Sequence, residues 1–309
     1  MPPDWPLSRR GFLQTTAATL VAAGSSEAVA AEEKPTPVID AHVHVWKNDS
    51  RYPWPKEVKD PPQADALPET LLRLMAAGGV EKAVLVHPIH YRWDCRYVAD
   101  VLKGYPGRFM GVCRVNPEAD GAADDLSRWV RDHGFGGVRL SPAADAAGDW
   151  ITDRPRMDRL LGRAAELRVP LCVLCRTARL PDVARLLERH RDDLDVCIDH
   201  MADCPPGRPD ELQKLLTLAR LPRVFVKVSH LWSLSREPYP YRDTHEQVKR
   251  VYDAFGPRRV MWGSDWPLVE RYCGYARALA LYRDEIGFFT AEDRRWVLGG
   301  TALRLWPFA

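Results

Sequence analysis

The feature that most constrains the fold is an alternation of short apolar runs with amphipathic stretches of helical period, repeated along nearly the whole chain. Eight runs have the length and composition of buried strands: residues 38–45, 82–87, 109–115, 137–140, 169–175, 195–200, 223–229 and 259–265. Helical spacing of apolar residues recurs between them, in residues 69–77, 124–131, 157–167, 183–190, 212–218, 247–255 and 275–285. Strands separated by helices favour parallel pairing with the helices outside, and eight strands are the number needed for a closed (β/α)8 (TIM) barrel.

The alternative architecture is an open, doubly wound sheet. Such a sheet often carries G-x-G-x-x-G after its first strand, whereas this first run ends in Ala41-His42-Val43-His44. The chain has 309 residues, of which 46% are hydrophobic, which suffices for one large core. Because α/β barrels commonly use roughly 250 residues, we expect one barrel domain over residues 32–309.

The first 31 residues have a different character. Ser8-Arg9-Arg10-Gly11-Phe12-Leu13 precedes a short Ala/Thr-rich stretch that ends in Ala28-Val29-Ala30. This segment resembles a twin-arginine export signal with an A-x-A cleavage site, which implies a periplasmic protein that matures near residue 31. The apolar core is shorter than the roughly 20 residues of a membrane span, so we expect no permanent anchor.

Charge and cysteine content exclude several other classes. There are 44 Lys and Arg against 42 Asp and Glu, interspersed along the chain, which argues against a nucleic-acid partner. The seven cysteines are irregularly spaced, so a disulfide scaffold is not expected. We interpret Cys172 and Cys175, a C-x-x-C inside an apolar run, as buried strand residues rather than a redox or structural zinc motif.

The expected partner is a small-molecule substrate, and the sequence does not indicate an oligomeric state.

Two histidines end the first strand. Asp40, His42 and His44 share one parity, and the apolar residues 39, 41, 43 and 45 share the other. Because side chains alternate across a strand, the apolar set is expected to face the helices and the two histidines to point into the barrel together. Two such imidazoles can converge on a metal ion or on one substrate oxygen.

Two later strands bring a His or an Asp to the same end. The sixth run ends with Asp199-His200 and the eighth with Gly263-Ser264-Asp265. Taken singly, His200 reads as a core histidine and Asp265 as a helix cap. Together with the first strand, they predict an active site at the carboxyl ends of the strands, where the chemistry of this fold is found.

Cations and loops complete the predicted site. Lys227 and Arg139 have the inward parity of their strands, where each needs an anionic substrate group or an ion pair with Asp40 or Asp199. Residues 46–66 and 88–94, after the first two strands, are candidate substrate walls. We therefore expect Lys227, Arg139, His87 and Trp46 to contact the substrate. His90 and His230 are further candidates to line the pocket.

These motifs resemble, in combination, the amidohydrolase-related family and particularly its sugar-lactone and pyrone-dicarboxylate lactonase branch. The likeness rests on residues 38–46, 51–54, 137–140, 199–200, 227–229 and 262–267, and runs from about residue 37 to residue 305. It implies hydrolysis of a lactone or similar carbonyl compound inside a barrel, with Arg139 contacting the substrate.

The sequence departs from the metal-dependent pattern of the wider superfamily. A further His or carboxylate is usual after the fourth and fifth strands, where this chain has Arg139 and Cys175-Arg176. His42, His44 and Asp265, with His200, could still hold one divalent ion, zinc being the best match, and Cys175 is a conceivable substitute ligand. The lactonase branch also includes members that work without metal, so both mechanisms stay open.

We accordingly expect Asp265 to act as general base on a water while His42, His44 and His200 polarise the carbonyl directly or through zinc. One alternative is metal-dependent, non-oxidative decarboxylation of an aromatic or muconate-like acid. The other is an exported binding protein that has lost catalysis.

Overall fold

The structure is a computed structural model that describes residues 36–141 and 154–308. The predicted export signal, residues 1–31, lies outside the described residues. Within the described ranges, no helix combines the length and apolar character that a membrane crossing requires.

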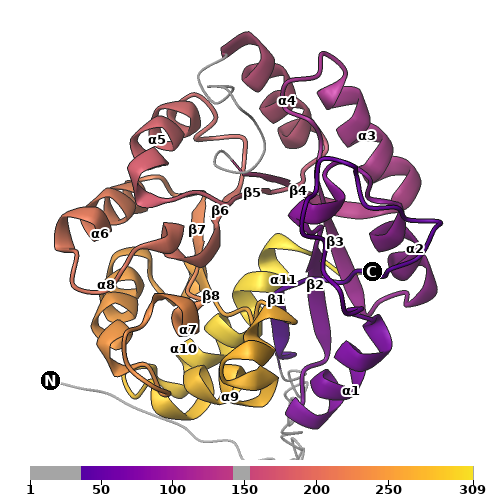
Figure 1. Ribbon diagram of the computed structural model, residues 1–309. Coiled ribbons are helices and arrows are strands. Elements are labelled where there is room, and N and C mark those ends of the chain that lie inside the picture. Colours follow the sequence, from indigo (N-terminus) through magenta and orange to yellow (C-terminus); the bar gives the residue numbers. More distant parts are fainter. Residues whose placement is uncertain (1–35, 142–153, 309) are drawn as a thin grey trace, which may run out of the picture. The chain divides into compact units, whose positions relative to one another are not determined.

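Eight parallel strands are hydrogen-bonded to their neighbours in chain order (Figure 1). They are β1 (Ile39–Val43), β2 (Lys82–Val86), β3 (Phe109–Cys113), β4 (Phe135–Leu140), β5 (Leu171–Val173), β6 (Val196–Ile198), β7 (Val224–Lys227) and β8 (Val260–Met261). The residues after β8 return to β1: His44 N donates to Trp266 O at 2.7 Å, and Asp265 N donates to His42 O at 2.8 Å. The predicted barrel is therefore confirmed, and the open sheet is excluded.

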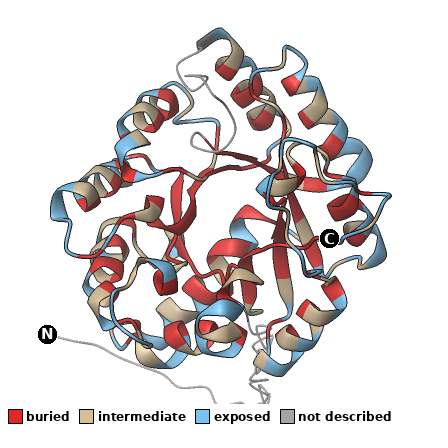
Figure 2. Ribbon diagram, in the orientation of Figure 1, coloured by how far each residue is buried: buried red, intermediate tan, exposed pale blue. Residues whose placement is uncertain are grey.

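Helices surround the barrel of strands. The strands are buried, and so is the side of each helix that faces them (Figure 2). They are α1 (Pro68–Gly78), α2 (Arg96–Gly104), α3 (Ala122–His133), α4 (Arg154–Glu166), α5 (Leu180–Glu188), α6 (Pro209–Leu216), α7 (Leu231–Leu234), α8 (His245–Phe255), α9 (Gly274–Ala280), α10 (Ala291–Arg295) and α11 (Thr301–Leu305). All seven expected helices are present, although the last continues as π-helix over Leu281–Glu285. Four helices were not expected from the sequence: α2, and the four- and five-residue helices α7, α10 and α11, which are too short to show a period.

The core has two parts. The larger part fills the space between strands and helices. The smaller one joins residues of β1, β2, β3, β5, β6, β7 and β8 to Trp306, and only the barrel interior can bring so many strands together. All seven cysteines are free and six are buried, which confirms the expectation for Cys172 and Cys175.

The strict alternation predicted for β1 is wrong in its first half. Ile39 and Ala41 belong to the interior cluster, whereas Val43 and Val45 pack with the outer core. The register with β2 shifts between Asp40 and Val43, so the parity of the strand changes there. As a result, the two histidines share the barrel interior without Asp40, which accepts hydrogen bonds from the backbone of Ser264 and His42.

Candidate active site

A cavity of about 190 Å³ lies at the carboxyl ends of the strands. Its walls come from segments that follow six of the eight strands and from Arg139 in β4: His44, Trp46, Pro88, Ile89, His90, Arg139, Leu174, His200, Asp203, His230, Asp265 and Leu268. Both predicted loop walls contribute, through Trp46 and through Ile89 and His90. The cavity is thus at the end of the barrel that the sequence predicts.

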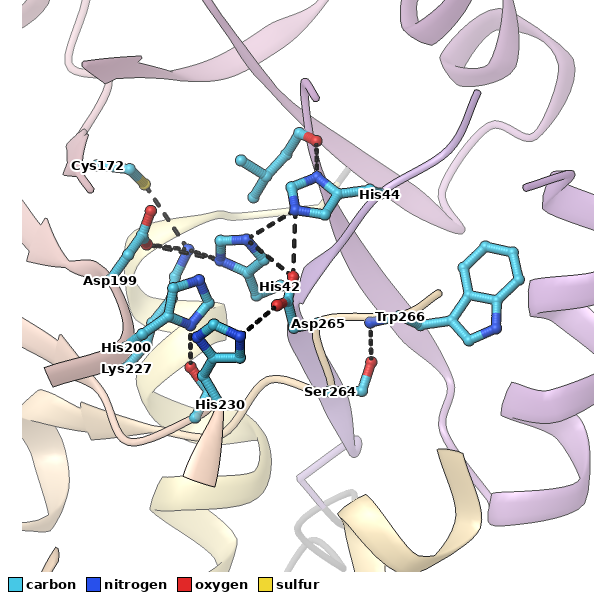
Figure 3. A network of polar contacts seen from close by, with 12 residues as sticks. His42, His44, Cys172, Asp199, His200, Lys227, His230, Ser264, Asp265 and Trp266 are labelled. Atoms are coloured by element: carbon cyan, nitrogen blue, oxygen red, sulfur yellow. Dashed lines mark hydrogen bonds and ion pairs between the residues drawn. The ribbon is translucent and has the colours of Figure 1, made fainter. Parts of the chain in front are cut away.

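Asp265 is the centre of the polar groups in this cavity (Figure 3). Its Oδ1 lies 3.2 Å from His44 Nε2 and 3.7 Å from His42 Nε2, and its Oδ2 lies 3.6 Å from His230 Nε2. Burial alone would raise the pKa of Asp265, but the contact with His44 and the nearby His200, His230 and His42 hold it below its ordinary value. Asp265 is therefore a carboxylate in neutral solution.

The ring nitrogens facing Asp265 have defined roles. The Nδ1 of His44 donates to Val86 O at 2.6 Å, which leaves the lone pair of the neutral ring on Nε2. That nitrogen is 3.3 Å from His42 Nε2 and 3.2 Å from the carboxylate. Because these are electron-rich atoms, their closeness calls for a proton or a metal cation between them.

The donor set suits a divalent metal ion. Ligand atoms of His42, His44 and Asp265 lie within 4.8 Å of one another, and nitrogen and carboxylate oxygen are donors that zinc accepts. Asp199 Oδ1 lies 3.5 Å from His42 Nδ1, on the side of the ring away from Asp265. His200 belongs to two neighbouring groups, one with His42 and Asp199 and one with His230 and Asp265, rather than to this one. Among the described residues, none of these groups of donors includes a cysteine, Cys175 among them.

An unusual backbone places the side chains that follow the last three strands. His200, His230 and Asp265 have φ angles of 52°, 69° and 59°. A non-glycine residue in this left-handed region costs about 1 kcal/mol or more, and such strain gathers at functional sites. His200 Nδ1 is fixed by Ser229 Oγ at 2.8 Å, and burial together with the neighbouring His42 and His230 holds the pKa of His200 well below its ordinary value. His200 is therefore neutral.

Beneath these groups, a buried ion-pair network crosses the barrel. Asp199 accepts from Arg139 Nε at 2.8 Å and lies 3.0 Å from Lys227 Nζ. Burial alone would raise the pKa of Asp199, but Lys227 and Arg139 hold it well below its ordinary value. Lys227 Nζ also donates to His42 Nδ1 at 3.1 Å, and burial and this ammonium group lower the pKa of His42 to about 3. The sequence left Asp40 and Asp199 as possible partners of Lys227 and Arg139. In the structure, Asp199 pairs with both cations.

The structure divides the residues predicted to contact substrate. Trp46 and Arg139 line the cavity, whereas Lys227 and His87 do not and are fully buried. Burial, with Arg114 nearby, lowers the pKa of His87 to about 3, and neither ring nitrogen has a hydrogen-bond partner among the described residues.

One polar residue of the cavity was not predicted from the sequence, and another was only a minor candidate. Asp203 lines the cavity and lies 3.6 Å from His230 Nδ1. His230, a minor candidate, makes ring contact with His200 at 4.6 Å between centroids. The only available signal was position, since both follow strands that end in other site residues.

Comparisons with known proteins agree with this geometry. Residues 39–308 match the model of the amidohydrolase family. An L-fucono-1,5-lactonase of Burkholderia ambifaria is 34% identical to this chain, over 85% of the chain and 93% of the relative. A 4-sulfomuconolactone hydrolase of Hydrogenophaga intermedia is 28% identical, over 74% of each protein.

A solved structure is similar over the whole barrel. An amidohydrolase of Burkholderia multivorans with bound zinc superposes with a TM-score of 0.72 at 25% identity, covering 88% of this chain and 100% of the other. The family match and the 34% identical relative are sufficient for assignment. The chain belongs to the amidohydrolase family.

Proposed function

From this family membership and the geometry of the cavity, we propose that the protein is a hydrolase that opens the ring of a lactone. The observation that carries the proposal is the ionised Asp265 on the wall of a small cavity, surrounded by histidines that include the neutral His200. The relatives named for the hydrolysis of sugar and muconate lactones support it. The L-fucono-1,5-lactonase favours a sugar 1,5-lactone as substrate class.

Asp265 acts as the general base. It takes a proton from the water that attacks the lactone carbonyl carbon, and the ring C–O bond then breaks to give a carboxylic acid and an alkoxide that receives the proton. The protonated Asp265 then passes its proton to the alkoxide, which is much more basic than a carboxylate. The product is a ring-opened hydroxy acid.

The carbonyl oxygen, which gains negative charge, is stabilised by neighbouring donors. His200 is held at Nδ1 by Ser229, so its Nε2 can donate into the cavity. Arg139 lines the same cavity and has further N–H groups besides the Nε that donates to Asp199. His42 is not on the cavity surface, and it supports His44 and Asp265 from below. Lys227 and His87 act on substrate only through their neighbours, whereas Trp46 forms a wall.

Zinc is the proposed metal when the site is loaded. His42, His44 and Asp265 would hold it, and His200 would act beside it; the ion would supply Lewis-acid polarisation of the carbonyl. The zinc-bound relative supports this choice. Elemental analysis of the purified protein, paired with hydrolysis before and after chelation, tests it: about one zinc per chain and chelator-sensitive activity are expected. A metal-free protein of full activity would contradict the proposal and assign the reaction to the side chains alone.

Export through the twin-arginine route is proposed from the first 31 residues. The expected mature N-terminus lies near residue 31, which sequencing of the protein from a periplasmic fraction tests. Replacement of both Arg9 and Arg10 by Lys should retain the precursor in the cytoplasm, and unchanged export of that variant would contradict the proposal.

The function itself is tested with a panel of lactones that includes L-fucono-1,5-lactone. Hydrolysis of each lactone is measured by the acid that it releases. Asp265→Asn should lower kcat by about 10²–10⁴-fold, the usual contribution of a general base. The matched control Asp125→Asn, on the exposed face of α3, should leave kcat unchanged. No turnover on any lactone, or Asp265→Asn activity equal to that of the control, would contradict the proposal.

A further inference from the structure

An aromatic groove lies beside the cavity, on the segments that follow β7 and β8. Its volume is about 630 Å³, and it is lined by Trp232, Glu237, Tyr239, Tyr241, Tyr272 and Arg277, among others. This volume falls within the range of small-molecule sites. None of these residues belongs to the catalytic groups described above.

The groove adjoins the active site through a stack of rings. His230, which lines the catalytic cavity, contacts the ring of Trp232 at 4.2 Å between centroids, and Trp232 contacts Tyr272 at the same distance. The cavity and the groove therefore lie on either side of the His230–Trp232 pair.

Two observations indicate a ligand with both an apolar face and polar edges. Tyr272 is 57% exposed, so much of its aromatic surface is open to the groove although Trp232 contacts its ring. Trp232 is only 7% exposed, yet its indole Nε1 has no hydrogen-bond partner among the described residues. A buried donor without a partner is costly, and a ligand hydroxyl would satisfy it.

The charges favour a neutral ligand. Glu237 and Arg277 contribute one charge of each sign, and the Arg277 guanidinium lies over the Tyr239 ring at 5.5 Å. A pyranose ring matches this lining, since its C–H face packs on aromatic rings and its hydroxyls bond to both charged groups. A second copy of the chain matches poorly, because a stable interface needs about 800 Å² per partner and only three large hydrophobic side chains are exposed in the described ranges.

We propose that this groove binds a pyranose ring, carried by the substrate as a second sugar unit attached to the lactone. This inference rests on the proposed function, which it deepens: the preferred substrate is the 1,5-lactone of a disaccharide acid. Trp232 donates to a hydroxyl of the second sugar, and Tyr272 covers the apolar face of that sugar.

The kinetic test compares cellobiono-1,5-lactone with glucono-1,5-lactone. The wild-type protein should prefer the disaccharide lactone by about tenfold in kcat/KM, equivalent to about 1.4 kcal/mol. Tyr272→Ala should reduce this ratio to about one. The control Tyr105→Ala removes a tyrosine that follows α2 and precedes β3, at the opposite end of the barrel, and should keep the ratio. Equal kcat/KM for the two lactones, or equal ratios in the two variants, would overturn the proposal.

A binding test separates failure of the groove from failure of the proposed function. Cellobiose is titrated into the full-length protein while the indole N–H resonance of Trp232, assigned with Trp232→Phe, is followed by NMR. A saturable shift that is lost in Tyr272→Ala supports the groove even if no lactone is opened. Without a shift of this resonance, the groove proposal is overturned, whereas lactone turnover would still support the proposed function.

Discussion

Removal of the Asp199 charge tests the reading of the buried network most directly. In Asp199→Asn, the cations Lys227 and Arg139 lose the carboxylate that lies 3.0 and 2.8 Å away. Lys227 is fully buried and Arg139 is 2% exposed, so water cannot replace the lost partner. The substitution keeps the size of the side chain and removes only its charge.

The expected cost follows from this burial. Breaking a buried ion pair by removal of one partner costs about 3–5 kcal/mol in the free energy of unfolding. For a domain of this size, each kcal/mol lowers Tm by about 2–4 °C, so Tm should fall by roughly 6–20 °C. The control Asp125→Asn, whose partner Arg128 is exposed, should change the free energy of unfolding by less than about 0.5 kcal/mol.

The pH dependence of this loss has a defined sign. The pKa of Asp199 in the folded protein lies well below its ordinary value of 3.8, so its stabilisation is complete above that value and is lost as the pH falls through the folded pKa. The Tm difference between wild type and Asp199→Asn should therefore be constant from about pH 5 to 8 and shrink below about pH 4.

Thermal unfolding followed by circular dichroism across this pH range is the assay. The double variant Asp199→Asn, Lys227→Met removes one of the stranded cations and should recover at least about 1 kcal/mol relative to Asp199→Asn. A Tm for Asp199→Asn within 2 °C of wild type, or a double variant no more stable than the single one, would refute the reasoning.

Three further predictions concern the site and its support. Gly263→Ala should reduce kcat/KM by more than tenfold in the lactone assay, because a Cβ there would lie 2.7 Å from His42 Cβ; full activity would show that the neighbouring backbone yields freely. Ser229→Ala removes the partner that orients His200 and should lower kcat more than it raises KM, whereas an effect on KM alone would contradict that role. Thr290→Ala removes the reciprocal capping bonds with Asp293 and should lower the free energy of unfolding by about 1 kcal/mol without changing kcat, as measured by urea denaturation.

The sequence alone determined the barrel and the end of it that carries the site. Alternation of strand and helix periods is a local property, and parallel strands place their carboxyl ends together, so the sequence alone predicts that His44, His200 and Asp265 lie near one another. The inward direction of Lys227 and Arg139 followed from the same period of two.

Tertiary structure alone decided which groups meet and in what state. The irregularity in β1 that separates Asp40 from the histidines depends on pairing with neighbouring strands, and strict alternation could not reveal it. The choice of Asp199 as partner of both cations, and the place of Asp203 on the cavity wall, depend on side chains from different strands and on left-handed backbone after β6. Such contacts are set by distances across the barrel, and those distances arise only when all eight strands close around one core.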